Sequence, residues 1–479
     1  MIAALLTTLA SLSAQAGGGD VAPGAAVEVA MEAPVGHAAP EMLAAATMPA
    51  IRGGDARQSA PPLGAIKTPP QQPGVLADST LNILFRNYRD SLTINGYGTQ
   101  RGWVQGAQAN FVSGLSSGQS GFGVDASLFG AVKLDGDGAS GDMVHVDRDG
   151  SGGERRKAWA YMGGYAVKAR YGGMLLKYGL QQVENVFLES KDNRALPPSF
   201  RGTTLSGQPA GGVGVEAGSI DAVNPRGRTG LVGLKTAYGG TPISRLSYGG
   251  VNLTSASGKV SVYAAQARDV WNQLFVAGRH SFGASEASKW TVSGAGYLTR
   301  DQGAGLQGPI GGKAYSVALA RQLGASELAV SFQHVMSDQY LDYVQEANGL
   351  YLANGMVADY NAPREKSLQL RYTANGADFS LPGMGVIFWG IAGRSKSPAQ
   401  VMRAAPEAGT WRDAYWRGGA HVHGNHHELG LKASYVFDRG DIKGVNLAFI
   451  ALVHRGSAHY VEPSEREYRL ILNVPVKVF

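Results

Sequence analysis

A regular alternation of apolar and polar residues, repeated in segment after segment, is the feature that most constrains this chain. In the segment 165–171, Lys168 and Arg170 alternate with Val167 and Tyr171. Successive side chains of a β-strand point to opposite faces, so such a segment has one apolar face and one wet face. The pattern therefore predicts half-buried β-strands, and it recurs in 81–86, 368–372 and 469–478.

A soluble β-sandwich and a membrane β-barrel both produce this alternation, and three observations favour the barrel. No change of composition interrupts the chain after residue 78. Tight connections alternate with long ones, as expected of outer-membrane barrels, and the final strand ends on Phe479. The sequence therefore predicts an all-β, transmembrane antiparallel β-barrel of about 18 strands, with the pairing near 200–238 left open. The long connections are expected at 135–154, 181–198, 339–364 and 396–425, and the tight ones at Gly172-Gly173, Gly239-Gly240 and 438–441.

Composition excludes several other classes of protein. The 479 residues contain no cysteine, which rules out a disulfide framework, a thiolate metal site and a cysteine nucleophile. The mean hydropathy of −0.11 and the lack of a long apolar run after the N-terminus argue against a bundle of membrane helices. The 68 glycines follow no three-residue period, so the chain is not collagen-like.

Three regions are expected along the chain. Residues 1–16 are apolar and end in a small-x-small triplet, as a secretory signal peptide does, although they lack a basic start. Residues 17–77 are rich in Ala, Pro and Gly, which predicts a disordered extension, and residues 78–479 form the barrel. The net charge of +6 conceals a charge of +8 on the barrel, because the extension is acidic.

Several short segments of the sequence (the family-like words) resemble the OprD-type outer-membrane porins, which are substrate-specific channels of Gram-negative bacteria. No single segment is diagnostic, but the segments are numerous, follow the order of the family and are spread over nearly all of 78–479. They are 84–88, 121–125, 133–136, 176–179, 192–202, 216–218, 359–372, 382–383, 426–428 and 469–475.

The resemblance implies an 18-stranded barrel, usually isolated as a monomer, whose third and seventh loops fold inward to form a constriction. It also implies a ladder of basic residues that leads small carboxylate-bearing solutes, such as amino acids, aromatic acids and small peptides, through the channel. Some members admit carbapenems, and one branch takes up chito-oligosaccharides.

Strand parity selects the candidates for such a ladder. A row of fixed cations offsets the hydration that an anion loses in a narrow lumen, and the arginine fork binds carboxylates in bidentate fashion. The residues that lie on the polar face of their strands and in or beside a family-like word are Arg86, Lys168, Arg170, Lys177 and Arg371. A solvated lumen charge, or a rim charge that faces lipopolysaccharide, is the alternative interpretation.

Two late strands depart from the family pattern. Relatives carry two ladder arginines in the segment that corresponds to 445–454, which here has no arginine before Arg455, and 386–394 is apolar until Arg394. We therefore expect a substrate that is weakly charged, zwitterionic or aromatic rather than strongly anionic.

The constriction is expected to draw on acidic, basic and tyrosine side chains of the third and seventh loops. The best candidates lie within family-like words or beside them: Asp192 and Arg194 in the third loop, and Asp359 and Tyr360 in the seventh. Such groups opposite a basic wall would create a transverse field that orients a zwitterion.

Other chemistry finds little support in the sequence. His421 and His423 would share a strand face, but His426, His427 and Glu428 match the start of a family strand, so no metal site is expected. Scattered groups such as His145, Asp192 and Ser199 lack a nucleophile elbow, so no catalytic residue is expected. The basic run 155–157 fits lipid phosphate at a rim better than nucleic acid.

The sequence thus predicts an outer-membrane, substrate-specific porin that passes small solutes without a cofactor or catalysis. Its other partners would be outer-membrane lipid and lipopolysaccharide, and we expect a monomer, with a trimer as the alternative. A general diffusion porin of the same fold is the nearest alternative function. An outer-membrane enzyme and a structural or adhesion barrel are the alternatives from other classes.

Overall fold

The computed structural model describes residues 74–479, except 97, 117, 119, 136–145, 148–153, 156, 397–415, 418–419, 422 and 461. The expected signal segment, nearly all of the expected extension, His145 and Arg156 lie outside the described residues, as do the side chains of Arg155 and His421. Among the described residues, no helix is long and apolar enough to cross a bilayer.

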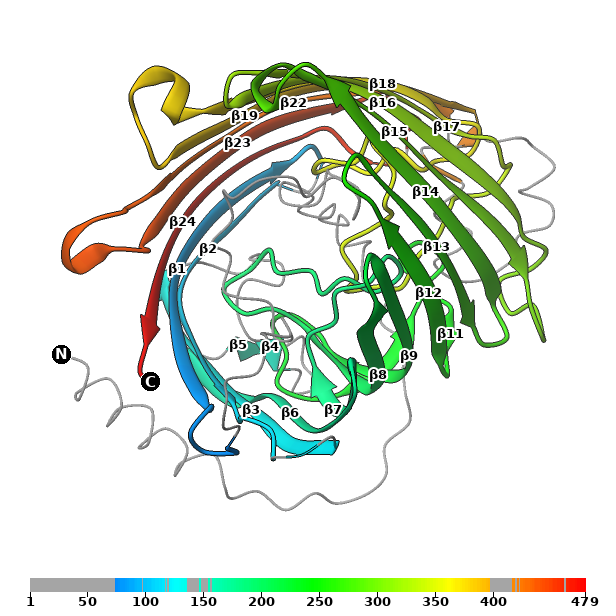
Figure 1. The fold of residues 1–479 in the computed structure, drawn as a ribbon. Helices are drawn as coiled ribbons and strands as arrows, with labels where there is room; N and C mark the ends of the chain where they lie inside the picture. Colours follow the sequence, from blue (N-terminus) through cyan, green and yellow to red (C-terminus); the bar gives the residue numbers. More distant parts are fainter. Residues whose placement is uncertain are drawn as a thin grey trace.

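Eighteen antiparallel strands close into a barrel, as predicted (Figure 1). Each strand pairs with the next, and β1 pairs with β24, so every strand has two neighbours and no edge faces lipid. The strands are β1 (Thr80–Ile94), β2 (Gly98–Val112), β3 (Ser120–Asp135), β6 (Ala158–Tyr171), β7 (Met174–Gln181), β8 (Ser199–Ala210), β9 (Val213–Asn224), β12 (Leu246–Thr254), β13 (Gly258–Ala267), β14 (Trp271–Gly283), β15 (Lys289–Asp301), β16 (Gly311–Leu323), β17 (Ser326–Val335), β18 (Lys366–Asn375), β19 (Met384–Lys396), β22 (His423–Val436), β23 (Asn446–Gly456) and β24 (Glu465–Lys477).

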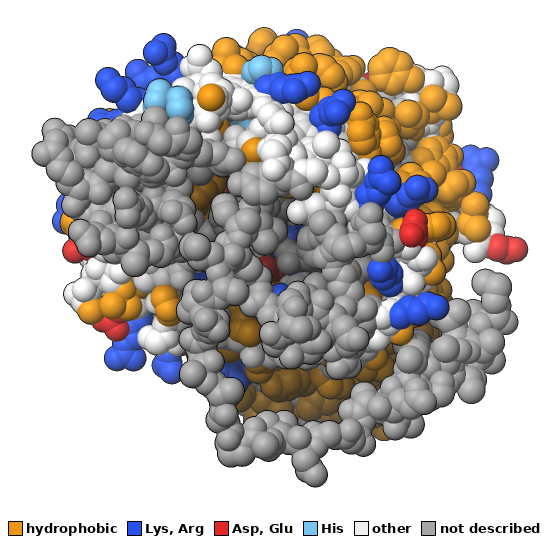
Figure 2. All heavy atoms as spheres, turned by 180° about the vertical axis from the view of Figure 1, so that it is seen from behind, with side chains coloured by type: hydrophobic (Ala, Val, Ile, Leu, Met, Phe, Trp, Pro, Cys, Tyr) orange, Lys and Arg blue, Asp and Glu red, His pale blue; other side chains and the backbone are white. Residues whose placement is uncertain are grey.

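The predicted alternation sets the two faces of the wall. On β18, Leu368 and Leu370 point outward and are each 57% exposed, whereas Gln369 and Arg371 point inward and are buried. In the view of Figure 2, hydrophobic side chains gather along the visible side of the barrel wall, with Lys and Arg beside them. Exposed aromatics such as Tyr171 and Phe379 lie beside the short turns, where the interfacial girdle of a membrane barrel is expected.

The region that the sequence left open is now assigned. β8 and β9 form a hairpin around a turn at 211–212, with register shifts after Arg201 and after Gly207. The next connection, 225–245, holds two short strands, β10 (Val232–Lys235) and β11 (Pro242–Ile243). The expectation of a barrel turn at Gly239-Gly240 was wrong, because these glycines turn the chain inside this long loop.

The long connections all lie on one rim of the barrel, together with the short connections 95–97 and 268–270. This long-loop rim carries loop 3 (182–198), loop 4 (225–245), loop 7 (336–365) and loop 9 (457–464). Two further connections on the same rim each hold a pair of short strands: β4 (Val146–Asp147) with β5 (Glu154–Arg155), and β20 (Trp416–Arg417) with β21 (Ala420–His421). The short-turn rim carries the 3-10 helices η2 (Glu286–Ser288), η3 (Gly376–Phe379) and η4 (Gly440–Ile442). Loops 3, 4 and 7 lie within the ring of strands (Figure 1), and they position the site described next.

Candidate functional site: a loop-constricted channel

Loops 3, 4 and 7 are joined to one another inside the barrel by backbone hydrogen bonds. The backbone of Ser190 bridges that of Ala347, and Thr236 bridges Val344. The Asn348 amide donates to the Glu189 carbonyl at 2.8 Å. Loop 7 is therefore held between loop 3 and loop 4 as the middle segment of a small irregular sheet.

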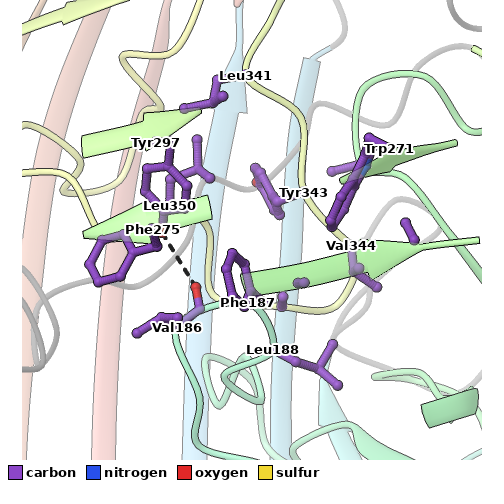
Figure 3. Packing of buried hydrophobic residues seen from close by; sticks show 14 of the residues in the cluster. Val186, Phe187, Leu188, Trp271, Phe275, Tyr297, Leu341, Tyr343, Val344 and Leu350 are labelled. Carbon is purple, nitrogen blue, oxygen red and sulfur yellow. Dashed lines mark hydrogen bonds between the residues drawn. The ribbon is translucent and has the colours of Figure 1, made fainter. Parts of the chain in front are cut away.

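A hydrophobic core anchors this assembly to one side of the wall. Val186, Phe187 and Leu188 of loop 3 pack with Phe275 and Tyr297 of β14 and β15 (Figure 3). The loop 7 residues of the same cluster are Leu341, Tyr343, Val344, Ala347 and Leu350. The Tyr297 hydroxyl donates to the Val186 carbonyl at 3.4 Å. Burial of so many aromatic and aliphatic side chains favours a fixed position for loops 3 and 7.

A second core occupies the opposite side of the barrel. The inward faces of β19 and β23 are largely apolar, as expected from their missing arginines, and include Trp389, Ile450 and Leu452. Leu196 of loop 3 and Val357 of loop 7 belong to the same buried cluster. The ends of loops 3 and 7 therefore pack against β19 and β23, the two strands whose inward faces carry no arginine.

Buried charges at the junction of the loops are compensated locally. Arg226 of loop 4 pairs with Glu346 of loop 7 at 2.7 Å, with side chains only 5% and 7% exposed. The Asp342 carboxylate accepts four hydrogen bonds of 2.8–3.0 Å, from the amides of residues 238, 239 and 343 and from the Gln307 side chain. Burial nevertheless raises the pKa of Asp342 above its usual value.

Two of the predicted constriction residues, Asp359 and Tyr360, are buried within loop 7. The Asp359 carboxylate accepts hydrogen bonds from the hydroxyls of Tyr238 at 2.6 Å and Tyr343 at 2.9 Å, and burial raises its pKa. The Tyr360 ring stacks on His426 with centroids 4.1 Å apart. Both side chains therefore hold the loop in shape in this structure.

The two loop 3 candidates, Asp192 and Arg194, differ in exposure. The Asp192 side chain is 45% exposed and accepts from both terminal nitrogens of Arg86, at 2.5 and 2.9 Å. Arg194 is buried, and its Nη1 donates to the carbonyl of the preceding residue. Arg86 also donates to the Arg194 carbonyl at 2.8 Å and to Asn473 at 2.8 Å, so this ladder candidate attaches loop 3 to β1.

Lys168 and Lys177 share one acidic partner. They lie directly opposite each other on β6 and β7, and both contact Asp125 of β3 at 2.7 Å, one at each carboxylate oxygen. Lys168 also donates to the Ser113 carbonyl at 2.7 Å. Arg170 lies two residues further along β6 and is partly buried, so this corner of the lumen keeps a positive net charge.

Arg371 stands inward on β18, opposite Trp389 of β19, and pairs with Glu327 at 3.4 Å. The strand parity therefore predicted the inward position of these basic side chains, but it missed their acidic partners. It also passed over Arg469 of β24, which makes a bidentate pair with Glu467 at 2.8 and 2.7 Å. A search for acidic residues on the same face would have found Asp125 on the neighbouring strand β3 and Glu467 two residues before Arg469 on β24.

A cavity of about 980 Å³ lies between the loops and the wall from β9 to β15, toward the short-turn rim. Its lining includes three acidic and three basic residues, and Tyr351 of loop 7 lies among them. The charged residues are Glu184, Glu216, Lys259, Arg279, Glu286 and Lys289.

Among the described residues, one group has the composition of a metal site. Ligand atoms of His426, His454 and Glu462 lie within 4.8 Å of one another near the long-loop rim. Local spacing did not predict this group, because the three residues come from β22, β23 and loop 9.

Comparison with known proteins agrees with this architecture. The model of the outer membrane porin, OprD family, matches residues 73–478. The chain belongs to the OprD family of outer membrane porins. It is 28% identical to Porin D of Pseudomonas aeruginosa over 426 residues, which cover 85% of this chain and 92% of Porin D.

Solved structures of the family superpose on the barrel. The crystal structure of OccD3 (OpdP) from Pseudomonas aeruginosa matches with a TM-score of 0.72 and 28% identity, over 85% of this chain and 93% of that one. OpdK with vanillate, from the same organism, matches with a TM-score of 0.74 over 84% of this chain and 100% of that one. Its identity is 22%, so this likeness concerns the fold.

The protein is thus a substrate-specific outer-membrane porin, and the predicted fold, function and location are confirmed. Its family is one of channels that pass small solutes. Such a protein provides a water-filled path across the membrane through the barrel lumen, and its long-loop rim corresponds to the outer surface.

Proposed function

We propose that this porin selects small molecules that carry a carboxylate together with a cationic group, such as amino acids and short peptides. Small monocarboxylates would pass less readily, and strongly anionic solutes would be disfavoured. The observation that carries the proposal is the pairing of the lumenal cations: Arg86 with Asp192, Arg371 with Glu327, and the two lysines Lys168 and Lys177 with the single Asp125.

Paired charges act differently from an unbroken row of cations. A row of free cations attracts any anion, whereas a cation with an acidic partner has a weak field at a distance and a strong one within contact range. A zwitterion can replace both partners at once, because its carboxylate meets the lysine or arginine and its ammonium meets the aspartate or glutamate. A dianion must break the pair without replacing the acid.

In this proposal, Arg86, Lys168, Arg170, Lys177 and Arg371 line the path, and Asp192 is the constriction residue that contacts the solute. Arg194, Asp359 and Tyr360 act indirectly, because they shape the loops. The cavity of about 980 Å³ below the loops, with its mixed charges, receives the solute after the constriction.

Solute flux into proteoliposomes tests the proposal. Alanine, lactate and malonate are similar in size and differ in charge type, and we expect the rates to fall in that order. A malonate rate equal to or above the alanine rate would overturn the proposed selectivity. Concentration-dependent block of the ion current by the preferred solute, in the sub-millimolar to millimolar range, separates a specific channel from a general diffusion porin.

We further propose that the barrel works as a monomer and that it matures by removal of residues 1–16, which leaves 17–77 as an extension before the barrel. The family resemblance supports the first point, and the composition of these segments supports the second. Sedimentation of the purified protein in detergent tests the oligomeric state. N-terminal sequencing of protein from outer membranes tests the cleavage site.

A further inference from the structure

Two inward-facing histidines meet near the outer rim, away from the paired basic residues. His426 of β22 and His454 of β23 lie on neighbouring strands and are 1% and 0% exposed. His426 Nδ1 lies 2.9 Å from His454 Nε2, and an oxygen of Glu462 from loop 9 lies 3.9 Å from the same Nε2.

The other nitrogens of these histidines have defined partners. His454 Nδ1 lies 3.0 Å from the Pro463 carbonyl, which only accepts, so this nitrogen carries the proton and Nε2 is bare. His426 Nε2 lies 2.5 Å from a carboxylate oxygen of Glu365. The Tyr460 hydroxyl and the Ala362 amide also donate to Glu365.

His426 Nδ1 and His454 Nε2 face each other at 2.9 Å, which is hydrogen-bond distance. A proton on His426 Nδ1 would join the two rings. A proton on His426 Nε2, which faces Glu365, leaves both of the facing nitrogens free to bind a metal ion. Among the described residues, Glu462 Oε2 is buried without a hydrogen-bond partner and lies beside the same point.

The donor set and its surroundings match those of zinc sites. Two imidazole nitrogens and one carboxylate oxygen are a common ligand set for Zn²⁺, with a fourth position left for water. Zinc-binding histidines donate their other N–H to a carboxylate or to a backbone carbonyl. His426 Nε2 faces the Glu365 carboxyl and His454 Nδ1 faces the Pro463 carbonyl, so both rings have an acceptor in the required place. For tetrahedral binding at about 2.0–2.1 Å, the two nitrogens need to move apart by only a few tenths of an ångström.

We propose that His426, His454 and Glu462 form a binding site for a borderline divalent ion, with Zn²⁺ as the expected occupant. The site joins β22 and β23 to loop 9, and through Glu365 it also holds the end of loop 7. A bound ion therefore fixes the outer mouth of the channel. This inference departs from our expectation from the sequence that no metal site exists.

Zinc titration of the full-length protein in detergent, after treatment with a chelator, tests this site. We expect one Zn²⁺ per chain by equilibrium dialysis with elemental analysis. His454→Gln and Glu462→Gln should each weaken the affinity at least tenfold. Glu365→Gln should weaken it about 10- to 100-fold, as loss of an outer partner does.

An exposed pair nearby provides the matched control. The rings of His423 and His459 stack with centroids 5.2 Å apart at the same rim, and a surface pair of this kind also attracts zinc. The double variant His423→Gln/His459→Gln should retain the one tight Zn²⁺. Loss of binding in this double variant, or no tight zinc in the wild type, would overturn the proposal.

Two further measurements keep the test decisive. Heat-modifiable electrophoretic mobility and circular dichroism establish that each variant is a folded barrel, so that lost affinity is not lost structure. X-ray absorption of the zinc-loaded protein should show two imidazole ligands and one carboxylate. A spectrum without imidazole scattering would contradict the assignment, and neither result bears on the solute selectivity proposed above.

Discussion

Replacing Asp125 by asparagine removes one negative charge from the lumen and changes almost nothing in volume. The wild-type cluster of Asp125 with Lys168 and Lys177 carries a net charge of +1, and the variant carries +2. We expect the channel to become more selective for anions, because the two lysines lose the carboxylate that balanced one of their charges.

The expected magnitude follows from Coulomb's law. At about 8 Å in water, one unit charge contributes roughly 0.5 kcal/mol, and roughly 0.2 kcal/mol after screening by 0.1 M salt. This energy favours anions and disfavours cations, so the anion-to-cation permeability ratio should rise about twofold, and up to about sixfold at low salt.

Reversal potentials in planar bilayers under a potassium chloride gradient measure this ratio. Asp438→Asn is the matched control, because Asp438 is exposed on the turn between β22 and β23. Lys177→Gln should shift the potential in the opposite direction, since it leaves a balanced pair of Lys168 and Asp125. A reversal potential of Asp125→Asn equal to that of the control would refute the reasoning.

Three further predictions concern loop 3 and the part of the wall against which the loops pack. Arg86→Gln removes the hydrogen bonds that attach loop 3 to β1 and should increase single-channel current noise, whereas Arg89→Gln, on the outer face, should behave as wild type. Burial, followed by the charge of Arg226, lowers the pKa of Lys191 to about 7, so Lys191 gains its charge as the pH falls through 7. The preference of the wild-type channel for anions should therefore rise between pH 8 and pH 6. A Lys191→Met channel whose anion preference changes equally with pH would contradict this prediction. A Cβ at Gly430 would lie 1.9 Å from the Trp389 ring. Gly430→Ala should therefore cost about 1–3 kcal/mol and lower the melting temperature, with Gly278→Ala, where the space is open, showing no such loss.

The barrel and its inward-facing cations were predictable from the sequence because both depend on local geometry. A strand repeats every two residues, so the parity of Lys168 or Arg371 follows from its immediate neighbours. The pairing of Lys168 with Asp125 depends instead on the register between β3 and β6, which includes an irregularity after Ser127. Local sequence does not contain that register.

The roles of the loop residues depend on still longer contacts. Asp359 lies in a family-like word and was expected at the constriction, yet its carboxylate is enclosed by tyrosines from loops 4 and 7. The meeting of His426 with His454 and Glu462 requires two strands and a loop. These contacts arise from tertiary packing of the loops, which the two-residue alternation of the strands does not predict.

The reversal potential of the wild-type channel under a salt gradient tests the central claim most directly, namely that acidic partners balance the lumenal cations. The described pairs predict a weak anion preference, well short of the Nernst potential for chloride. A reversal potential close to that limit would mean that the basic residues act as free cations, and it would contradict the account.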